Sequence, residues 1–336
     1  MLRISVIGLG SWGVALAGLL YDNGHEVAIW GRSPEKVVEA RTKRRCSYLP
    51  DYELNKNIMV TDQLNEAAKR AEMIVISTAS AGVRSTSRGL ADLINKNAVV
   101  VSAAKGIDPN TLETMTTVIE SEIPGVMTAA LSGPSHAEEV AAGLPATCVA
   151  ASRAADAAKF VQDAFMSERF RVYTSEDPLG VELGGALKNV IALAAGISDG
   201  MAFGDNAKAA LMTRGIAEIA RLGSAMGADL LTFSGLSGIG DLIVTCESMH
   251  SRNRRAGILI GRGKTLEETL QEVRTVVEGV NTAKAAYALA DMYNVDMPIT
   301  HEIYNTLFTG KSPSDAVSDL MGRNRKSERN WRLNIL

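Results

Sequence analysis

Cysteine is scarce in this sequence of 336 residues. The three cysteines, Cys46, Cys148 and Cys246, are odd in number and widely spaced. This pattern fits neither a disulfide framework nor a metal knuckle, so we predict a reducing compartment and no bound metal. The net charge of −3 also lacks the basic excess of nucleic-acid-binding and membrane-surface proteins. We therefore expect no nucleic-acid partner.

Long uncharged apolar runs are absent as well. None reaches the ~18–20 residues that a membrane span requires, and even the apolar stretch Leu183–Ile197 contains Lys188. The N-terminus runs straight into Ile4–Gly8, without the longer apolar region and small-residue cleavage site of a signal peptide. We expect a cytoplasmic protein with no membrane insertion.

The first half of the chain alternates short apolar runs with helix-like segments. The density of Val and Ile in these runs, and the helical patterns between them, predict a Rossmann-like, doubly wound, mostly parallel sheet of the α/β class. Ser33-Pro34 is typical of a helix start. The expected strands are Arg3–Ile7, Glu26–Trp30, Ile58–Val60, Met73–Ser77, Ala98–Ser102, Met127–Leu131, Thr147–Ala151 and Phe170–Tyr173.

After about Asp177 the strand-like runs end and Ala- and Leu-rich helical patterns follow, with a further helix start at Ser312-Pro313. Because the length exceeds that of one compact core, we predict a dinucleotide-binding domain at residues 1–177 and an all-helical substrate domain at 178–336. No low-complexity linker separates them, so the ligand site is expected in a cleft between tightly packed domains. The expected helices are Leu179–Gly196, Asn206–Met226, Leu266–Gln271 and Asn281–Tyr293.

A glycine-rich motif follows the first expected strand. Gly8-Leu9-Gly10-Ser11-Trp12-Gly13 opens the expected helix Trp12–Leu20, which is the strand–turn–helix context of a dinucleotide-binding loop. In that role Gly8 permits the tight turn, Gly10 lets the backbone approach a pyrophosphate, and Gly13 lets the helix pack closely on the strand. The alternative is a tight turn without a ligand. The context favours a dinucleotide.

The end of the second expected strand distinguishes the two nicotinamide dinucleotides. A site for NAD normally offers an acidic residue there to the ribose 2′-hydroxyl. This chain has Trp30-Gly31-Arg32-Ser33, with no acid before Glu35. Because a guanidinium can pair with a 2′-phosphate, Arg32 favours NADP as the cofactor and leaves NAD as the second choice. The alternative is a solvated loop arginine.

Two polar segments follow later strands. Lys105 lies just past a strand end, at the edge where open α/β sheets bind ligands, and is a candidate to contact substrate or nicotinamide. The alternative is a surface lysine. The segment Leu131–Glu139 can line a site with its Ser and Gly backbone, and it also predicts a helix capped by Ser135 with Glu138 completing a capping box. His136 is interpreted as a local hydrogen-bonding residue.

The expected helix after residue 177 contains two adjacent glycines, Gly184 and Gly185, which each cost ~0.5–1 kcal/mol relative to Ala. Such a cost indicates that another backbone or a ligand comes close. Lys188 follows among apolar residues, where burial would lower its pKa toward neutrality and suit it to acid–base work on an alcohol. The alternative is a lysine that reaches the surface with its ammonium group.

A second group of polar residues comes later, at Gly238–Leu242 and Ser251–Arg255. A hydroxyl, an amide and several guanidinium groups within five residues are typical of an anion site, because Arg binds phosphate bidentately. Asp241 could orient the lysine or accept a substrate hydroxyl. A solvated basic loop is the alternative for Ser251–Arg255.

Together these motifs resemble the bacterial-type NAD(P)-dependent glycerol-3-phosphate dehydrogenase family, from Ile4 to about Asp319. Seven motifs in order are more specific than any one of them. They are Gly8-Leu9-Gly10-Ser11-Trp12-Gly13, Ala104-Lys105-Gly106, Leu131-Ser132-Gly133-Pro134-Ser135, Gly184-Gly185-Ala186-Leu187-Lys188-Asn189, Gly238-Ile239-Gly240-Asp241-Leu242, Ser251-Arg252-Asn253-Arg254 and Val277-Glu278-Gly279-Val280.

The resemblance implies roles for individual residues. Lys188 matches the family's catalytic proton-transfer lysine. The implied dinucleotide-binding positions are Gly8, Gly10, Ser11, Trp12, Gly13, Arg32, Lys105, Ala137, Arg252, Val276 and Glu278. The implied substrate-binding positions are Lys105, Gly133, Ser135, Lys188, Asp241, Ser251, Arg252 and Asn253. The chain departs from the family at Leu9, where Ala is frequent, and at His136, where Phe is frequent.

The implied reaction is the reduction of dihydroxyacetone phosphate to sn-glycerol 3-phosphate for phospholipid biosynthesis. NAD(P)H would deliver the hydride, Lys188 the proton, and Lys105 a positive charge near the carbonyl oxygen. Arg252 and Asn253 would hold the phosphate of this small substrate. The oligomeric state is left open, and a homodimer is compatible with the sequence.

Two alternative functions stay open. A two-domain dehydrogenase for a 3-hydroxy acid or a sugar acid phosphate also places a lysine on the first helix of its second domain, and its arginine would bind a carboxylate. A non-catalytic dinucleotide sensor would need the glycine loop but not Lys188 beside a phosphate site. The basic tail Arg323–Lys326 is expected to be solvated.

Overall fold

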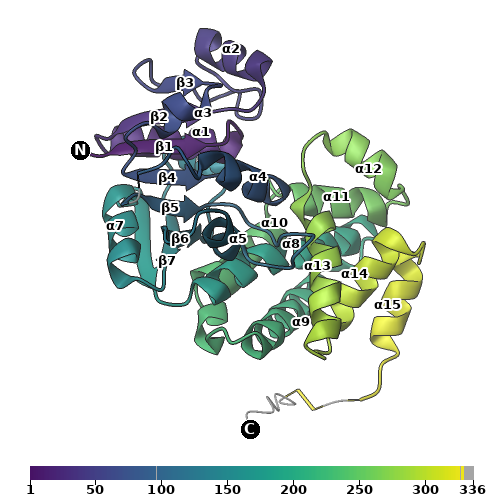
Figure 1. Ribbon diagram of the computed structural model, residues 1–336. Coiled ribbons are helices and arrows are strands. Elements are labelled where there is room, and N and C mark those ends of the chain that lie inside the picture. The colour runs from purple at the N-terminus through teal and green to yellow at the C-terminus, as the bar shows by residue number, and fades with distance from the viewer. Residues whose placement is uncertain (96, 326, 329–336) are drawn as a thin grey trace.

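The computed structural model describes residues 1–95, 97–325 and 327–328. An eight-stranded sheet with helices on both faces forms the first part of the chain, here called the sheet region. It ends with strand β8, and the described chain from Pro178 onward contains only helices, here called the helical region (Figure 1). The predicted fold class, a Rossmann-like doubly wound sheet followed by a helical C-terminal part, is confirmed.

The strands lie in the order β3-β2-β1-β4-β5-β6-β7-β8. All neighbours pair in parallel except β6 and β7, which are antiparallel. Every predicted strand is present, with bounds that differ by at most two residues. The strands are β1 (Arg3–Ile7), β2 (Glu26–Trp30), β3 (Met59–Thr61), β4 (Met73–Ile76), β5 (Val99–Ser102), β6 (Met127–Ser132), β7 (Ala146–Ala151) and β8 (Phe170–Ser175).

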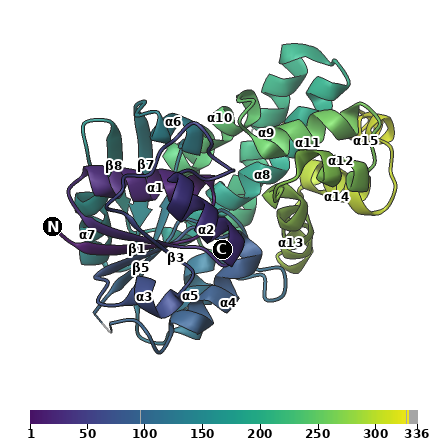
Figure 2. The ribbon, with the colours of Figure 1, turned by 90° about the horizontal axis from the view of Figure 1, so that it is seen from above.

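Both faces of the sheet are apolar, because parallel strands are covered by helices on each side. Alternate residues of one strand therefore enter different cores: in β4, Met73 and Val75 pack on one side, and Ile74 and Ile76 on the other. Figure 2 shows the two layers, with α1 and α6 on one side of the strands and α3, α4 and α5 on the other.

The helices of the sheet region begin where local capping chemistry permits. Ser33 caps α2 by accepting a hydrogen bond from the N–H of Lys36, and Pro34 occupies the first turn, as predicted. These helices are α1 (Ser11–Asp22), α2 (Pro34–Lys43), α3 (Leu64–Ala68), α4 (Ser80–Leu90), α5 (Met115–Glu122), α6 (Ala137–Ala141) and α7 (Ala155–Phe165).

Helix α8 forms the centre of the helical region and is buried from Gly180 to Ser198. It packs closely on α11, where a Cβ atom at Gly257 would lie 2.2 Å from the carbonyl oxygen of Leu193. Short turns at Leu230–Ser234 (3₁₀) and Leu236–Gly240 (π) precede α10. The helices are α8 (Pro178–Gly200), α9 (Gly204–Ala225), α10 (Asp241–Glu247), α11 (Arg252–Gly261), α12 (Leu266–Val273), α13 (Glu278–Met292), α14 (Pro298–Phe308) and α15 (Pro313–Met321).

The four helices expected in this part are all present, but α10, α11 and α14 were not predicted. Length did not decide this, because α11 and α14, with 10 and 11 residues, are longer than the predicted α12, with 8. Among the described residues, α8 alone is long and apolar enough to cross a membrane, and its apolar window is wholly buried inside the structure. Its apolar character is that of a core helix.

Candidate active site

Two lysines from different parts of the chain share one buried carboxylate. Lys188, on α8, donates a hydrogen bond to Oδ1 of Asp241, the first residue of α10. Lys105, in the loop after β5, donates to Oδ2 of the same carboxylate at 2.7 Å. The side chains of Lys188 and Asp241 are 7% and 2% exposed, and that of Lys105 is 19% exposed. Positive charge thus exceeds negative charge in a place that water barely reaches.

Burial dominates the electrostatics of this Lys188 cluster, which we define as Lys105, Lys188 and Asp241. It lowers the pKa of Lys188 to about 7, with the charge of Lys105 adding to the effect and that of Asp241 opposing it. Burial by itself would raise the pKa of Asp241, but the two ammonium groups outweigh it and hold this pKa below its ordinary value. A lysine that can gain or lose a proton near neutral pH is suited to general acid–base catalysis.

Thr245 completes the polar contacts of Lys188 and was not singled out in the sequence. Its hydroxyl accepts a hydrogen bond from Lys188 Nζ at 2.7 Å and donates one to the backbone oxygen of Asp241 at 2.6 Å. Thr245 lies four residues after Asp241, on the same face of α10. The four-residue spacing of Asp241 and Thr245 indicates a shared helix face only when α10 is known to be a helix, and this helix was not predicted.

The loop after β6 meets the loop after β5 because these parallel strands are neighbours and their carboxyl ends share one edge. Lys105 Nζ donates to the carbonyl oxygen of Gly133 at 2.8 Å, and Ser135 Oγ donates to the same oxygen at 3.0 Å. The predicted capping box is wrong. Helix α6 begins at Ala137 with His136 at its N-cap and no side-chain cap, since the Ser135 hydroxyl turns back to Gly133.

The adjacent glycines of α8 make room for neighbouring chain segments, as predicted. A Cβ atom at Gly184 would lie 2.5 Å from the backbone oxygen of Ser237, just before α10. A Cβ atom at Gly185 would lie 2.5 Å from Ser132 Oγ, at the end of β6. The glycines therefore allow α8 to approach both the helix that carries Asp241 and the sheet edge.

Asn253, a predicted substrate residue, lies buried in a chain of hydrogen bonds. Its Nδ2 donates to Asn189 Oδ1 at 2.9 Å, and its Oδ1 accepts from the N–H of Gly279 at 2.9 Å. Asn189 Nδ2 in turn donates to the carbonyl oxygen of Lys105 at 3.1 Å. These hydrogen bonds join Asn189, next to Lys188, to Asn253, next to Arg252. They also hold the loop that contains Lys105 in place.

The cluster Ser251–Arg255 is not a loop but the start of α11. Ser251 is the N-cap and accepts a hydrogen bond from the N–H of Arg254. Arg254 is engaged with Asp199, with Nε and Oδ2 2.8 Å apart, so its guanidinium serves the structure of the helical region. Arg252 is exposed and forms no hydrogen bond or ion pair with the described residues. It directly precedes Asn253 in the chain, and its guanidinium is not engaged by another described residue.

The glycine loop has the geometry of a dinucleotide site. Gly8 has φ +137°, and a Cβ atom there would lie 2.7 Å from Ser77 Oγ. A Cβ atom at Gly13 would lie 1.9 Å from the carbonyl oxygen of Gly8, so the turn requires glycine. A Cβ atom at Gly10 would instead meet no protein atom within 4 Å, and no side chain caps the N-terminus of α1. The residues present therefore fit a pyrophosphate at this helix end.

The other predicted dinucleotide residues lie on both regions. Ser11 and Trp12 form the first turn of α1 and are half-buried. Arg32 follows β2, is exposed, and forms no hydrogen bond or ion pair with the described residues. Ala137 is buried at the first position of α6, and Val276 is 47% exposed just before α13. The structure thus places Arg32 beyond the end of β2, on the same sheet edge as the glycine loop.

Glu278 joins the two regions. Its carboxylate accepts hydrogen bonds from the N–H and the hydroxyl of Ser80, at 3.0 and 2.6 Å, at the N-terminus of α4. A Cβ atom at Gly106 would lie 2.4 Å from Cβ of Ser80. The contact between Glu278 and Ser80 therefore lies beside Gly106, the residue after Lys105. Ser80 was not predicted, and its position on the helix after β4 was the only available signal.

His136 is the main departure from the family pattern. Its ring lies 5.9 Å from that of His250, and its Nε2 is 3.5 Å from the backbone oxygen of Val244. Burial lowers the pKa of His136, and the nearby charge of Lys188 adds to this. Its partner Val244 lies on α10, 108 positions along the chain, so this contact of His136 is not the local hydrogen bond that was expected.

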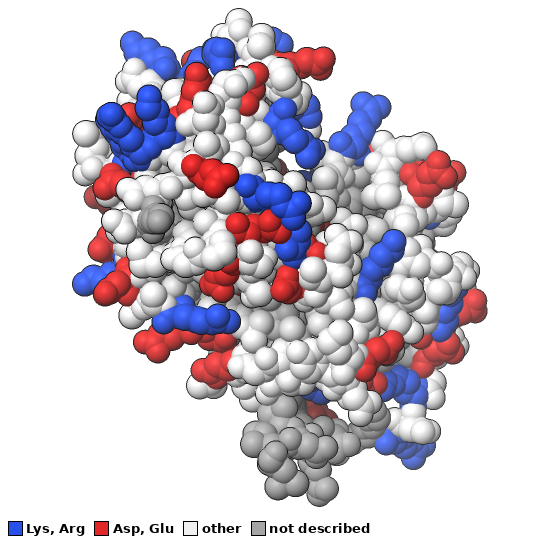
Figure 3. Space-filling view, in the orientation of Figure 1, with Lys and Arg blue, Asp and Glu red and all other residues white. Residues whose placement is uncertain are grey.

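Basic side chains flank the junction of the two regions. Figure 3 shows a notch between the sheet region and the helical region, with Lys or Arg side chains on both sides of it. In the tail, Arg323 pairs with Asp296 at 2.7 Å and is therefore not simply solvated, while Lys326 lies outside the described residues.

Comparison with known proteins agrees with this geometry. The family models described as NAD-dependent glycerol-3-phosphate dehydrogenase N-terminus and C-terminus match residues 3–158 and 177–318. A relative from Fusobacterium nucleatum, named glycerol-3-phosphate dehydrogenase [NAD(P)+], is 51% identical over 98% of this chain and 99% of its own length. One of the same name from Thermoanaerobacter sp. is 53% identical over 97% and 99%.

A solved structure of glycerol-3-phosphate dehydrogenase from Coxiella burnetii superposes with a TM-score of 0.93. It is 35% identical, and the match covers 96% of this chain and 99% of that one. The resemblance seen in the motifs is confirmed: this chain belongs to the bacterial NAD(P)-dependent glycerol-3-phosphate dehydrogenase family and is an oxidoreductase.

Proposed function

We propose that this enzyme reduces dihydroxyacetone phosphate to sn-glycerol 3-phosphate in the cytoplasm, as the source of the glycerol backbone of phospholipids. The observation that carries the proposal is the Lys188 cluster, at the sheet edge that also holds the glycine loop. In this proposal residues 1–177 bind the dinucleotide and residues 178–336 bind the substrate. The named activity of the relatives supports the choice of substrate.

The proposed chemistry assigns one task to each group of the cluster. A bound nicotinamide dinucleotide supplies the hydride to the C2 carbonyl carbon. Lys188 donates a proton to the oxygen of that carbonyl as it becomes an alkoxide, and it takes the proton back from the alcohol in the reverse direction. Lys105 stabilises the negative charge that grows on the same oxygen. Asp241 holds both ammonium groups in place.

The remaining predicted residues would bind and orient. Gly133 and Ser135 would line the substrate side of Lys105. The carbonyl oxygen of Gly133 accepts hydrogen bonds from both Lys105 and Ser135, which holds the three residues together. Arg252 and the N-terminus of α11 would hold the phosphate, where the guanidinium and the helix N–H groups both attract an anion. Ser251 and Asn253 shape this helix start through their own hydrogen bonds.

Arg252→Ala is expected to weaken phosphate binding without changing the chemical step. A charge-assisted hydrogen bond contributes about 1.5–3 kcal/mol, and the exposure of Arg252 places the loss at the lower end, so KM for dihydroxyacetone phosphate should rise about tenfold. Steady-state kinetics measures this. Arg255→Ala is the matched control, since Arg255 is exposed on the same helix start and has no partner among the described residues. Equal effects in both variants would contradict the assignment.

Arg32→Ala is expected to remove a preference for NADPH over NADH. The exposed guanidinium can bind the 2′-phosphate with about 1.5–3 kcal/mol, which corresponds to roughly a 10- to 150-fold preference. In the variant, KM for NADPH should rise accordingly and KM for NADH should stay the same. In the wild type, added salt should reduce the difference between KM for NADPH and KM for NADH. A wild-type enzyme that uses both cofactors equally would overturn the proposed NADP preference.

The pH dependence of turnover should have opposite signs in the two directions. Ketone reduction needs protonated Lys188, so kcat should fall about tenfold for each pH unit above the pKa of about 7. Alcohol oxidation needs the neutral lysine, so kcat should rise up to that pH and then level off. Both profiles are measured with saturating substrates. A flat profile for reduction between about pH 7 and 9 would show that Lys188 is not the proton donor.

The function is tested by comparing substrates in an NADPH-oxidation assay. Dihydroxyacetone phosphate should be reduced rapidly, whereas unphosphorylated dihydroxyacetone and 3-oxo acids should react poorly. Rapid reduction of a 3-oxo acid would favour the hydroxy-acid dehydrogenase alternative. Tight NADP(H) binding without turnover of any ketone would favour a dinucleotide sensor.

A further inference from the structure

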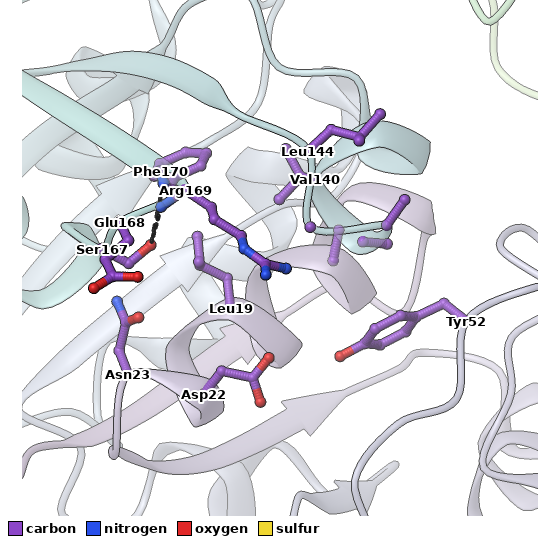
Figure 4. Close-up of a pocket in the computed structure, with 14 residues that line it drawn as sticks. Leu19, Asp22, Asn23, Tyr52, Val140, Leu144, Ser167, Glu168, Arg169 and Phe170 are labelled. Atoms are coloured by element: carbon purple, nitrogen blue, oxygen red, sulfur yellow. Dashed lines mark hydrogen bonds between the residues drawn. The ribbon is translucent and has the colours of Figure 1, made fainter.

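A second pocket lies on the sheet region, away from the Lys188 cluster. It encloses about 420 Å³, within the usual range for small-molecule sites, and is formed by the C-terminal half of α1, the segment from α6 to β7, and the turn that leads into β8 (Figure 4). Leu19, Val140, Leu144 and Phe170 give it apolar walls. Along α1 the lining extends to Asp22, at the opposite end of the helix from the glycine loop.

Three polar groups meet in this pocket without a partner. The guanidinium of Arg169, the carboxylate of Asp22 and the hydroxyl of Tyr52 point toward the same space in Figure 4. None of them forms a hydrogen bond or an ion pair with the described residues. Burial raises the pKa of Asp22 and of Tyr52, while Asp22 and Arg169 are exposed at the rim of the pocket and Tyr52 is half-buried. A bound molecule with complementary groups would replace water at Arg169 and Asp22 with charge-assisted contacts.

Two glycines allow these side chains to take their places. A Cβ atom at Gly143, which has φ +71°, would lie 2.7 Å from Nη1 of Arg169. A Cβ atom at Gly18, in the middle of α1, would lie 1.9 Å from the hydroxyl oxygen of Tyr52. The arginine and the tyrosine therefore occupy space that a side chain at Gly143 or Gly18 would enter.

The charges of the lining select the class of ligand. Arg169 is positive, while Asp22 and Glu168 are negative, so a simple anion would meet two carboxylates and a simple cation would meet the guanidinium. A molecule that carries both charges satisfies both sides. We propose that this pocket is a second ligand site for a small zwitterion, with its carboxylate or phosphate on Arg169, its ammonium group on Asp22, and a short apolar frame between them.

The site is connected to the reaction site by two helices. Helix α1 begins at the glycine loop and ends at Asp22, and α6 begins just after Ser135 and ends beside Gly143. The two helices pack against each other. A ligand in the pocket therefore contacts the far ends of the helices whose near ends carry the predicted dinucleotide and substrate residues, without occupying either of those positions.

The test measures binding of two zwitterions, and of inorganic phosphate, to the full chain by isothermal titration calorimetry. L-leucine offers a carboxylate and O-phosphoethanolamine offers a phosphate, so the pair identifies which anionic group is accepted. NADP⁺ and dihydroxyacetone phosphate are present at saturation to occupy the reaction site, and they cannot react with each other because both are oxidised. At least one zwitterion should bind, and inorganic phosphate should bind more weakly than the zwitterion.

Variants then locate the site. Arg169→Met and Asp22→Asn should each weaken binding by at least about tenfold, because each removes one charge-assisted contact. Tyr52→Phe keeps the packing on Gly18 and should weaken binding less. Arg171→Met is the matched control, since Arg171 lies two residues further along, on β8, and its guanidinium is placed over Tyr173, outside the lining. Binding of neither zwitterion, or a loss in only one of the two charge variants, would overturn the proposal.

Discussion

Lys188→Ala is expected to reduce turnover by ~10²–10⁴-fold, the range for loss of one general acid–base group. Binding of the dinucleotide should change little, because Lys188 contacts Asp241 and Thr245 of the helical region and not the glycine loop. The measurement is kcat for reduction of dihydroxyacetone phosphate, with NADPH affinity determined separately by fluorescence titration. The loss should be as large in the oxidation direction, since the same nitrogen handles the proton in both.

Lys208→Ala is the matched control for this experiment. Lys208 is also a buried lysine of the helical region, with a side chain 8% exposed, but its ammonium group pairs with Asp199 at 3.1 Å. Its removal should lower stability, because Asp199 keeps only one of its two cations, Arg254, and should leave turnover of the folded enzyme near normal. A Lys188→Ala enzyme that keeps more than about a third of wild-type turnover would exclude Lys188 as the proton donor.

Asp241→Asn is expected to have the second largest effect. Its carboxylate binds both Lys105 and Lys188, so the amide would leave two ammonium groups close together without a counter-charge. Misplacement of the reacting groups by about 1 Å can cost ~10²-fold, and turnover at pH 7 should fall by about that factor. Loss of the attraction should also lower the pKa of Lys188, so that the pH at which reduction begins to decline moves to a lower value.

Stability separates this effect from general damage. Removal of one partner of a buried ion pair costs about 3–5 kcal/mol, and deprotonation of Lys188 would relieve part of it, so denaturant unfolding should show a smaller loss at pH 9 than at pH 6. Asp199→Asn is the control, because Asp199 also lies between two cations, Lys208 and Arg254. It should destabilise the protein without moving the pH profile. An unmoved profile in Asp241→Asn would contradict the role given to this carboxylate.

Most elements of the sheet region could be predicted from local patterns. The glycine motif, the apolar runs and the Ser-Pro helix start each act over a few residues, so their signals survive without knowledge of the tertiary structure. Helix α11 was harder to foresee, because its first turn consists of the polar residues of the Ser251–Arg255 cluster. Likewise, the Ser135 cap was predicted from a valid local pattern, but the Ser135 hydroxyl donates its hydrogen bond to the carbonyl oxygen of Gly133 instead.

Local sequence patterns were enough to predict the class of sheet, the glycine loop, a long apolar helix with one lysine in it, and the set of residues that resemble a dehydrogenase site. These depend on periodicity and on backbone requirements within one segment. The folded chain was needed to show that Lys105 and Lys188 share Asp241, that Arg254 pairs with Asp199 while Arg252 has no partner among the described residues, and that Glu278 binds Ser80. Such pairings join residues that are tens to hundreds of positions apart in the chain. Burial and electrostatic interactions depend on distances in the folded structure, and local sequence patterns carry no information about those distances.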